Sequence, residues 1–146
     1  MMKFKKAVVF NDYIRPVCLP TTGMNFVGEY CKASGWGRVE SNAKLANTLQ
    51  VVHIKVFGWT ICRSAYSSTY RISVSNKHVC AGTLQGGKGT CKGDSGGPLT
   101  CVKNHRHYLI GLTSFGSNCA KPNFPDVYTN VAVYLNWIRS IMSGNP

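Results

Sequence analysis

The sequence predicts an all-β, antiparallel fold, either a sandwich or a barrel, that ends in an α-helix. Short apolar runs with prominent β-branched and aromatic residues alternate with turn residues such as Gly58, Asn104 and Pro122. A helical period appears at the C-terminal end, and no internal repeat or low-complexity tract interrupts the pattern. With 146 residues, the chain has the length of one ordinary domain.

Each predicted element is an apolar run bounded by turn residues. The predicted strands are Leu49–Phe57, Pro98–Val102, Tyr108–Phe115 and Val127–Asn130. Trp59–Tyr66 predicts a short helix directly after the first of them. In the C-terminal helix, apolar residues recur at three- and four-residue steps and stop before Gly144. They are Tyr134, Leu135, Ile138, Ile141 and Met142.

The charge is strongly basic, with 17 Lys and Arg against five Asp and Glu and a formal net charge of +12. Such an excess suits a polyanion, heparin-like polymers included. The tight cluster formed by Lys3, Lys5 and Lys6 lacks the interleaved stacking aromatics of a nucleic-acid binder. We therefore expect no nucleic-acid partner, and read the charge as a basic surface on part of a larger protein.

Seven cysteines indicate an oxidising compartment, and hence a secreted, extracellular protein. No CxxC pair or zinc-finger spacing occurs, so no metal site is predicted. Three disulfides and one leftover thiol are the default. No apolar run approaches the ~18 residues of a membrane span. The apolar run Ala7–Phe10 is too short for an export signal, so we expect an N-terminal part to be missing.

The chemistry is concentrated in the segment Gly89–Leu99. A serine flanked by glycines allows a substrate close to the backbone, where adjacent NH groups can stabilise an oxyanion. The spacing also fits the nucleophile elbow of α/β-hydrolases. That elbow needs a helix after the serine, and then an acid that precedes a His in the chain. Here Pro98 and a β-like run follow the serine, and His105 and His107 precede Asp126, so this reading fails.

The string GDSGGPL at Gly93–Leu99 resembles the trypsin/chymotrypsin-like serine proteases. Further family motifs follow in order along nearly the whole chain. They are Arg15–Pro20, Ser34–Gly37, Cys80–Gly82, Ser114–Gly116, Val127–Thr129 and the last helix with Trp137–Ile138. The resemblance implies an antiparallel Greek-key β-barrel, the second of two, with a C-terminal helix. Residues 1–24 would be the last strand of a missing first barrel plus the connector, and residues 25–146 the second barrel and helix.

The resemblance also assigns roles to residues around the motif. Ser95 matches the catalytic nucleophile, and the NH groups of Gly93 and Ser95 match the oxyanion hole. Asp94 matches the acid that pairs with the N-terminal ammonium created by activation. Further residues match positions that bind substrate, although most members carry Trp where Phe115 stands. They are Gly89, Thr90, Lys92, Ser114, Phe115, Gly116 and Asp126.

The resemblance implies three disulfides and a role for the remaining cysteine. The pairs are Cys31 with Cys101, Cys62 with Cys80, and Cys91 with Cys119. On the loop-entropy model each contributes about 3 to 4.5 kcal/mol. Cys18 matches the position at which two-chain members hold a light chain or propeptide. A buried free thiol is the alternative for Cys18.

The substrate pocket departs from the trypsin pattern. Gly89 stands where trypsin-like members place an Asp, and Asp126 stands on the facing wall, where Gly is usual. A buried carboxylate attracts either a substrate cation or an internal one such as Lys121. The sequence therefore weakly favours cleavage after Arg or Lys. An Asp salt-bridged at the pocket rim is the alternative.

The family's catalytic His and Asp come from the first barrel, and the chain begins a few residues after the expected Asp. The histidines present, His53, His78, His105 and His107, match neither role, and His105-x-His107 as a metal pair is a minor alternative. We therefore expect a serine endopeptidase acting on proteins or peptides without a cofactor, truncated at its N-terminus, inactive alone and poorly folded. The alternatives are a non-catalytic homologue that acts as a binding module, or a truncated chain without function.

Overall fold

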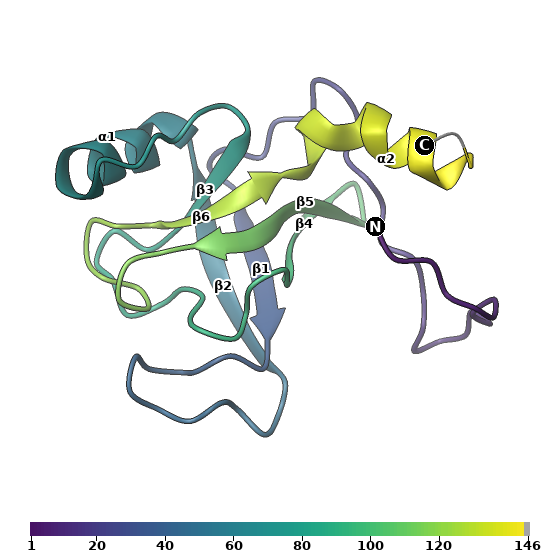
Figure 1. Ribbon diagram of the computed structural model, residues 1–146, viewed down its shortest axis with the longest axis horizontal. Helices are drawn as coiled ribbons and strands as arrows, with labels where there is room; N and C mark the ends of the chain where they lie inside the picture. The colour runs from purple at the N-terminus through teal and green to yellow at the C-terminus, as the bar shows by residue number, and fades with distance from the viewer. Residues whose placement is uncertain (145–146) are drawn as a thin grey trace.

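Six antiparallel strands close into one barrel in the order β1-β2-β3-β6-β5-β4. The computed structural model describes residues 1–144 (Figure 1). The elements, in chain order, are β1 Tyr30–Gly35, β2 Gln50–Phe57, α1 Trp59–Tyr70, β3 His78–Gly82, β4 Pro98–Lys103, β5 Arg106–Phe115, β6 Asp126–Asn130, η1 Val131–Tyr134 and α2 Leu135–Met142. The prediction of an all-β antiparallel barrel with a C-terminal helix is confirmed.

Buried and more exposed residues alternate along much of β1, β2 and β4, whereas β3 and β6 each bury three consecutive residues. In β1, Cys31 and Ala33 point inward and face Ile54 and Val52 of β2 across the ladder. The strands contribute a continuous core, and burial of a Leu, Ile or Val side chain contributes about 1.5–3 kcal/mol. Its fully buried large residues include Ile54, Leu99 and Tyr128. The Cys31–Cys101 disulfide joins β1 to β4 inside this core.

Two strands and part of a helix differ from the sequence prediction. The motif Ser34–Gly37 resembles the strand that opens the family's second barrel, but β1 begins earlier, at Tyr30, and ends at Gly35. The backbone turns there because Gly37 N donates a hydrogen bond to Asp94 Oδ1 at 2.8 Å. β3 was not predicted as a strand. Helix α1 runs four residues past Tyr66 and ends at Tyr70, and the C-cap residue Arg71 takes the left-handed conformation.

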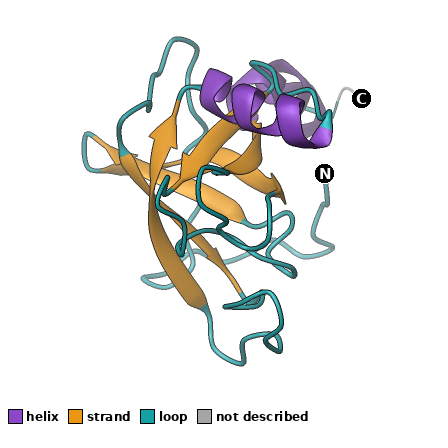
Figure 2. Cartoon of the chain, turned by 90° about the vertical axis from the view of Figure 1, so that its left-hand side faces the viewer, coloured by secondary structure: helices purple, strands orange, loops and turns teal. Residues whose placement is uncertain are grey.

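The two helices lie on one side of the barrel (Figures 1 and 2). Residues 1–29 form no strand, although the resemblance makes 1–24 partly the last strand of a first barrel. An isolated strand has no partner for its backbone groups, and Cys18 makes a single bridge, to Tyr108. Phe4, Val8 and Val9 are 76%, 41% and 81% exposed. Within residues 1–144 no helix is long and apolar enough to cross a membrane.

Candidate active site

The loop between β3 and β4 holds Ser95 in a fixed turn. Asp94 N donates to Cys91 O at 3.1 Å, and Gly97 N donates to Asp94 O at 2.8 Å. A hydrogen bond from Gly96 N to Thr113 O, at 2.9 Å, joins the same turn to β5. The turn therefore presents Ser95 as an exposed residue on a rigid backbone.

Gly93 is required by conformation and by space. Its φ is +101°, and a Cβ there would lie 2.6 Å from Leu45 Cδ2. Within residues 1–144, the NH groups of Gly93 and Ser95 donate no hydrogen bond, while the preceding carbonyl, Lys92 O, accepts one from Arg38 N at 2.9 Å. Two backbone donors thus stay available on either side of Asp94. Such a pair can stabilise a negatively charged oxygen.

Asp94 is held from two sides. Its Oδ1 accepts from Gly37 N at 2.8 Å, and its Oδ2 accepts from Cys91 N at 3.0 Å. The carboxylate lies directly against Gly35 and Gly37, where any Cβ would collide with it. Asp94 also lines a cleft of about 170 Å³, between β1, β2 and the segment 87–90. This cleft could admit a small cationic group next to the Asp94 carboxylate.

A pocket of about 330 Å³ opens beside Ser95. Thr90, Cys91 and Lys92 form one wall, and Thr113–Gly116 form another. A third wall comes from Ser41 and Asn42, which the sequence did not single out. Arg38 Nη1 donates to Ser41 O at 3.0 Å and Ser41 Oγ donates to Asn118 O at 3.0 Å, which fixes that loop. Only the fold reveals this wall, because its residues lie far from the motif in sequence.

Asp126 lies behind the pocket wall and is 1% exposed. Its Oδ2 accepts hydrogen bonds from Thr90 N at 2.5 Å and from Thr90 Oγ1 at 3.0 Å. Burial raises the pKa of the carboxyl group to about 6, although the hydrogen bonds from Thr90 lower it in part. Thr90 therefore satisfies one of the two carboxylate oxygens of Asp126.

Two residues lie elsewhere than the sequence suggested. Lys121 does not pair with Asp126; its Nζ lies 4.6 Å from the centre of the Phe124 ring, and no salt bridge to Asp126 forms within residues 1–144. Thr90 satisfies Oδ2 of Asp126, while Oδ1 accepts no hydrogen bond within residues 1–144. Nor does Gly89 line the pocket beside Ser95. It lines the cleft next to Asp94, because the backbone at Gly89 and Thr90 separates the two spaces.

The end of β5 forms the open edge of the pocket. The β5–β6 register shifts between Thr113 and Phe115, so Ser114 has no residue opposite it in β6. Ser114 is exposed, and Gly116 follows at the pocket wall. Phe115 packs edge-on against Tyr66 of α1 at 5.4 Å between ring centres. This unpaired backbone can accept an extended peptide as a further strand.

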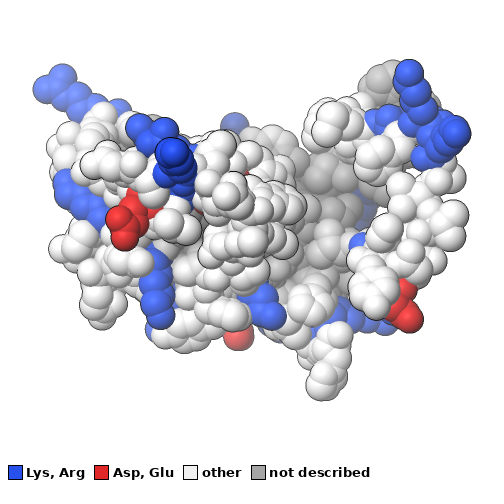
Figure 3. Space-filling model, turned by 90° about the horizontal axis from the view of Figure 1, so that it is seen from below, with Lys and Arg blue, Asp and Glu red and all other residues white. Residues whose placement is uncertain are grey.

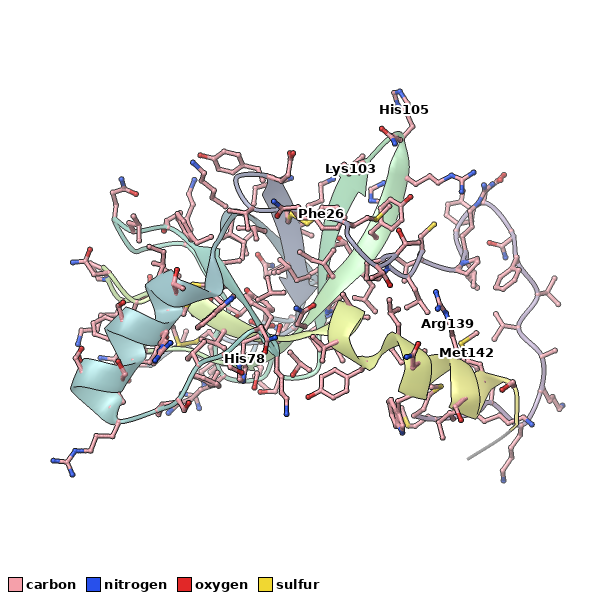
Figure 4. The ribbon with its side chains drawn as sticks, turned by 90° about the horizontal axis from the view of Figure 1, so that it is seen from above. Phe26, His78, Lys103, His105, Arg139 and Met142 are labelled. Atoms are coloured by element: carbon pink, nitrogen blue, oxygen red, sulfur yellow. A yellow bond between two sulfur atoms is a disulfide. The ribbon has the colours of Figure 1, made fainter. Side chains whose placement is uncertain are left out.

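The histidines lie away from Ser95. None of them lines the pocket. His78 Nδ1 accepts from Ser75 N at 3.1 Å, and its ring faces Phe115. His53 lies in β2, His105 lies at the tip of the β4–β5 hairpin (Figure 4), and His107 is the second residue of β5. Within residues 1–144, no three His, Cys, Asp or Glu residues gather in a metal-binding arrangement.

The cysteines pair as the resemblance implies. Cys31–Cys101, Cys62–Cys80 and Cys91–Cys119 form disulfides, and the last joins two walls of the pocket. Cys18 is free and half-buried, and its backbone pairs with His107 and Leu109 of β5. Lys and Arg are spread over the surface and outnumber the acids on the face shown in Figure 3.

Comparisons with known proteins agree with this geometry. Residues 1–138 match the family described as Trypsin. A venom protease of Bombus pensylvanicus is 40% identical over 93% of this chain and 56% of its own length. Human testisin is 36% identical over 98% of this chain and 47% of its own length. Bovine coagulation factor XI is 40% identical over 99% of this chain and 23% of its own length. The chain spans about half, or less, of these relatives.

Proposed function

The chain belongs to the trypsin family of serine proteases, and we propose that it is the nucleophile-bearing part of a secreted serine endopeptidase. The observation that carries this proposal is the position of Ser95. It stands exposed at the mouth of a pocket, between two backbone NH groups that donate to no described residue. A turn that served structure alone would have no need to keep both donors available.

In the proposed reaction, Ser95 Oγ attacks the carbonyl carbon of a peptide bond and gives its proton to a base. The NH groups of Gly93 and Ser95 stabilise the oxyanion that forms. The C–N bond then breaks, the amine takes the proton from the base, and an acyl-enzyme remains on Ser95. Water attacks this ester in the same way and releases the acid. Ser114 and Gly116 hold the substrate backbone, and Lys92 and Phe115 contact its side chains.

The base and the acid that orients it would come from outside these 146 residues. Serine is a weak nucleophile without a base, and no described histidine lines the pocket. An apolar groove of about 380 Å³ beside α2, lined by residues that include Val131, Trp137 and Ile138, offers a surface for a further barrel. Residues 1–24 would then complete that barrel and its connector. The chain alone is accordingly proposed to be inactive.

Asp94 is proposed to link activation to the oxyanion hole. The cleft beside it has room for an N-terminal ammonium, which would pair with the Asp94 carboxylate. Because Asp94 lies between Gly93 and Ser95, an ion pair there would hold both NH groups in place. Asp126, behind the pocket, supports a weak preference for cleavage after Arg or Lys.

The remaining proposals concern partners. Protein or peptide substrates follow from the proposed reaction. Cys18 is free and half-buried, which supports a disulfide to a light chain or propeptide. The net charge of +12 supports binding to a polyanion such as heparin. Three disulfides support an extracellular location.

The test is covalent labelling of the native, activated protein with a fluorophosphonate, followed by mapping of the labelled residue. We expect labelling at Ser95, and its loss in Ser95→Ala, whose peptidase rate should fall by about 10³-fold or more. Ser114→Ala is the matched control, because it removes a neighbouring hydroxyl and leaves the peptide backbone unchanged. An activated protein that binds peptides but neither reacts with the probe nor cleaves them would be a non-catalytic binding module.

A further inference from the structure

A hollow of about 180 Å³ shares no lining residue with the pocket beside Ser95. It lies where the loop before β1, the turn from β2 into α1, and the starts of β3 and η1 meet, and we call it the β2–α1 hollow. Its lining is mainly apolar and includes Phe26, Val27 and Trp59. Small-molecule pockets measure about 300–1,000 Å³. The β2–α1 hollow is smaller, so it fits one or two side chains of a protein partner better than a small molecule.

Cationic side chains stand at two sides of the hollow, each over one of its aromatic rings. Lys103 Nζ lies 5.5 Å from the centre of the Phe26 ring and donates to Asn25 O at 3.1 Å. Figure 4 shows Lys103 beside Phe26. On the other side, Arg63 Cζ lies 5.8 Å from the centre of the Trp59 ring. Neither cation forms a salt bridge within residues 1–144.

His78 adds a hydrogen-bond donor to the lining of the hollow. Its Nδ1 accepts a hydrogen bond from Ser75 N at 3.1 Å. The neutral ring therefore carries its proton on Nε2, because the nitrogen that accepts cannot hold it. Within the described chain this Nε2–H donates to no acceptor. It remains available to an acceptor on a partner.

The charges around the hollow determine which partner it fits. Glu29 is the acidic residue nearest to Phe26 in sequence, and it forms no salt bridge with Lys103 or Arg63 within residues 1–144. The two cations thus keep their charge available to a partner. Complementary charges at a contact favour the matching partner and fix its register. An apolar hollow between two such cations matches an apolar side chain that has carboxylates on both sides of it.

We propose that the β2–α1 hollow docks an acidic segment of a protein partner. An aromatic or aliphatic side chain of that segment fills the hollow, and its carboxylates contact Lys103, Arg63 and His78 Nε2. The inference goes beyond the proposed peptidase reaction, because no residue of the hollow takes part in that reaction. A partner held here leaves the pocket beside Ser95 open.

The test titrates the native protein with three pentapeptides and follows the NMR signals of the Phe26 and Trp59 rings. The probe is acetyl-Asp-Glu-Phe-Glu-Asp-amide. One control peptide has Ser in place of Phe and keeps the charge, and the other has Asn and Gln in place of the four acids and keeps the Phe. We expect the probe to shift both ring signals and to bind at least about tenfold more tightly than either control.

Three results would overturn the inference. Equal binding of the Ser control would mean that a basic protein simply attracts an anionic peptide. Equal binding of the neutral control would leave the cations without a role. No binding of the probe, as when a further part of the native protein already covers the hollow, would exclude the docking site. Fluorophosphonate labelling of Ser95 needs no occupant in the hollow and reports separately on the proposed endopeptidase function.

A pair of charge variants assigns the binding to one place on the surface. Arg63→Gln removes the cation beside Trp59, so we expect it to weaken binding of the probe about threefold and to leave binding of the neutral peptide unchanged. Arg71→Gln is the matched control, because it removes the same charge at the C-cap of α1, away from the lining. It should change neither. Equal weakening by both variants would show that binding follows net charge, which contradicts the proposal.

A second pair tests the apolar contact. Val27→Ser removes apolar surface from the hollow, and we expect it to weaken binding of the probe about threefold. Val102→Ser is the control, since Val102 is similarly exposed, at 49% against 55% for Val27, and lies on β4 outside the lining. Equal binding by the two variants would contradict insertion of a side chain into the hollow. If a variant fails to fold, the three peptides on the wild-type protein still decide the inference.

Discussion

At the scale of single residues, the ionisation of Asp126 works against the stability of the fold. Its pKa rises from 3.8 in the unfolded chain to about 6, mainly through burial. Between these values the folded state binds more protons than the unfolded state, so the contribution of Asp126 to stability is fully present below about pH 4 and is lost as pH rises through about 6. A tenfold change in a protonation equilibrium corresponds to about 1.4 kcal/mol. The total effect is therefore about 3 kcal/mol.

This cost predicts the behaviour of Asp126→Asn. We expect the free energy of unfolding of the variant, relative to wild type, to increase by about 3 kcal/mol between about pH 4 and pH 8. Urea denaturation across that range measures it. Asp12→Asn is the control, because Asp12 is exposed and its pair with Arg15 lies on the surface. A pH-independent difference for Asp126→Asn would show that Asp126 is not neutral in the folded protein below pH 6.

At the scale of elements, the turn around Gly93 should decide whether the oxyanion site exists. Gly93→Ala adds a side chain at positive φ and against Leu45, so we expect a loss of about 1–3 kcal/mol in stability and a large loss in fluorophosphonate labelling of the native, activated protein. Gly28→Ala is the matched control, since Gly28 has φ +95° with open space around its Cβ position and lines neither the pocket nor the cleft beside Asp94. It should cost only the conformational strain, about 1–2 kcal/mol, and keep labelling. Equal labelling of the two variants would contradict the proposed role of the turn.

The elements also show what the sequence could predict. β2, β5 and α2 follow from apolar periodicity and turn residues, and their bounds match within about two residues. The first strand was expected at the motif Ser34–Gly37, but β1 begins earlier, at Tyr30. Its inward residues Cys31 and Ala33 are small, so its hydrophobic pattern is weak in the sequence. The predicted helix ended at Tyr66, because the next residues, Ser67, Ser68 and Thr69, have low helix propensity. In the structure α1 continues through them to Tyr70.

Some residues of the candidate site could be predicted from the sequence, and others could not. The GDSGGPL string identified Ser95, Gly93 and Asp94, because the chemistry lies in one continuous segment. The contact between Thr90 and Asp126 joins residues 36 positions apart, and no local pattern encodes it. The wall formed by Ser41 and Asn42 was missed for that reason. Lys121 was considered as a partner of Asp126 on its charge alone, but its Nζ lies over the Phe124 ring.

At the scale of the whole molecule, two apolar surfaces stand open to solvent. One is the groove beside α2, where Trp137 is 53% exposed, and the other is the N-terminal segment, where Phe4 is 76% exposed. Contiguous apolar surface of this kind marks an interaction site. Under the proposed function, a further barrel covers the groove, so the same residue should behave differently in the chain alone and in the native protein.

Trp137→Gln tests this difference. In the isolated chain the side chain is half exposed, so we expect its stability to change by no more than about 0.5 kcal/mol. In the native protein, with any preceding chain retained, the same substitution would open a gap in a buried interface and cost about 3 kcal/mol or more. Trp36→Gln is the matched control, because Trp36 is 59% exposed on the loop after β1, away from the groove. Denaturation of both variants in both forms measures the effect. An equal, small cost of Trp137→Gln in the two forms would mean that the groove stays uncovered, and the two-barrel proposal would lose its structural support.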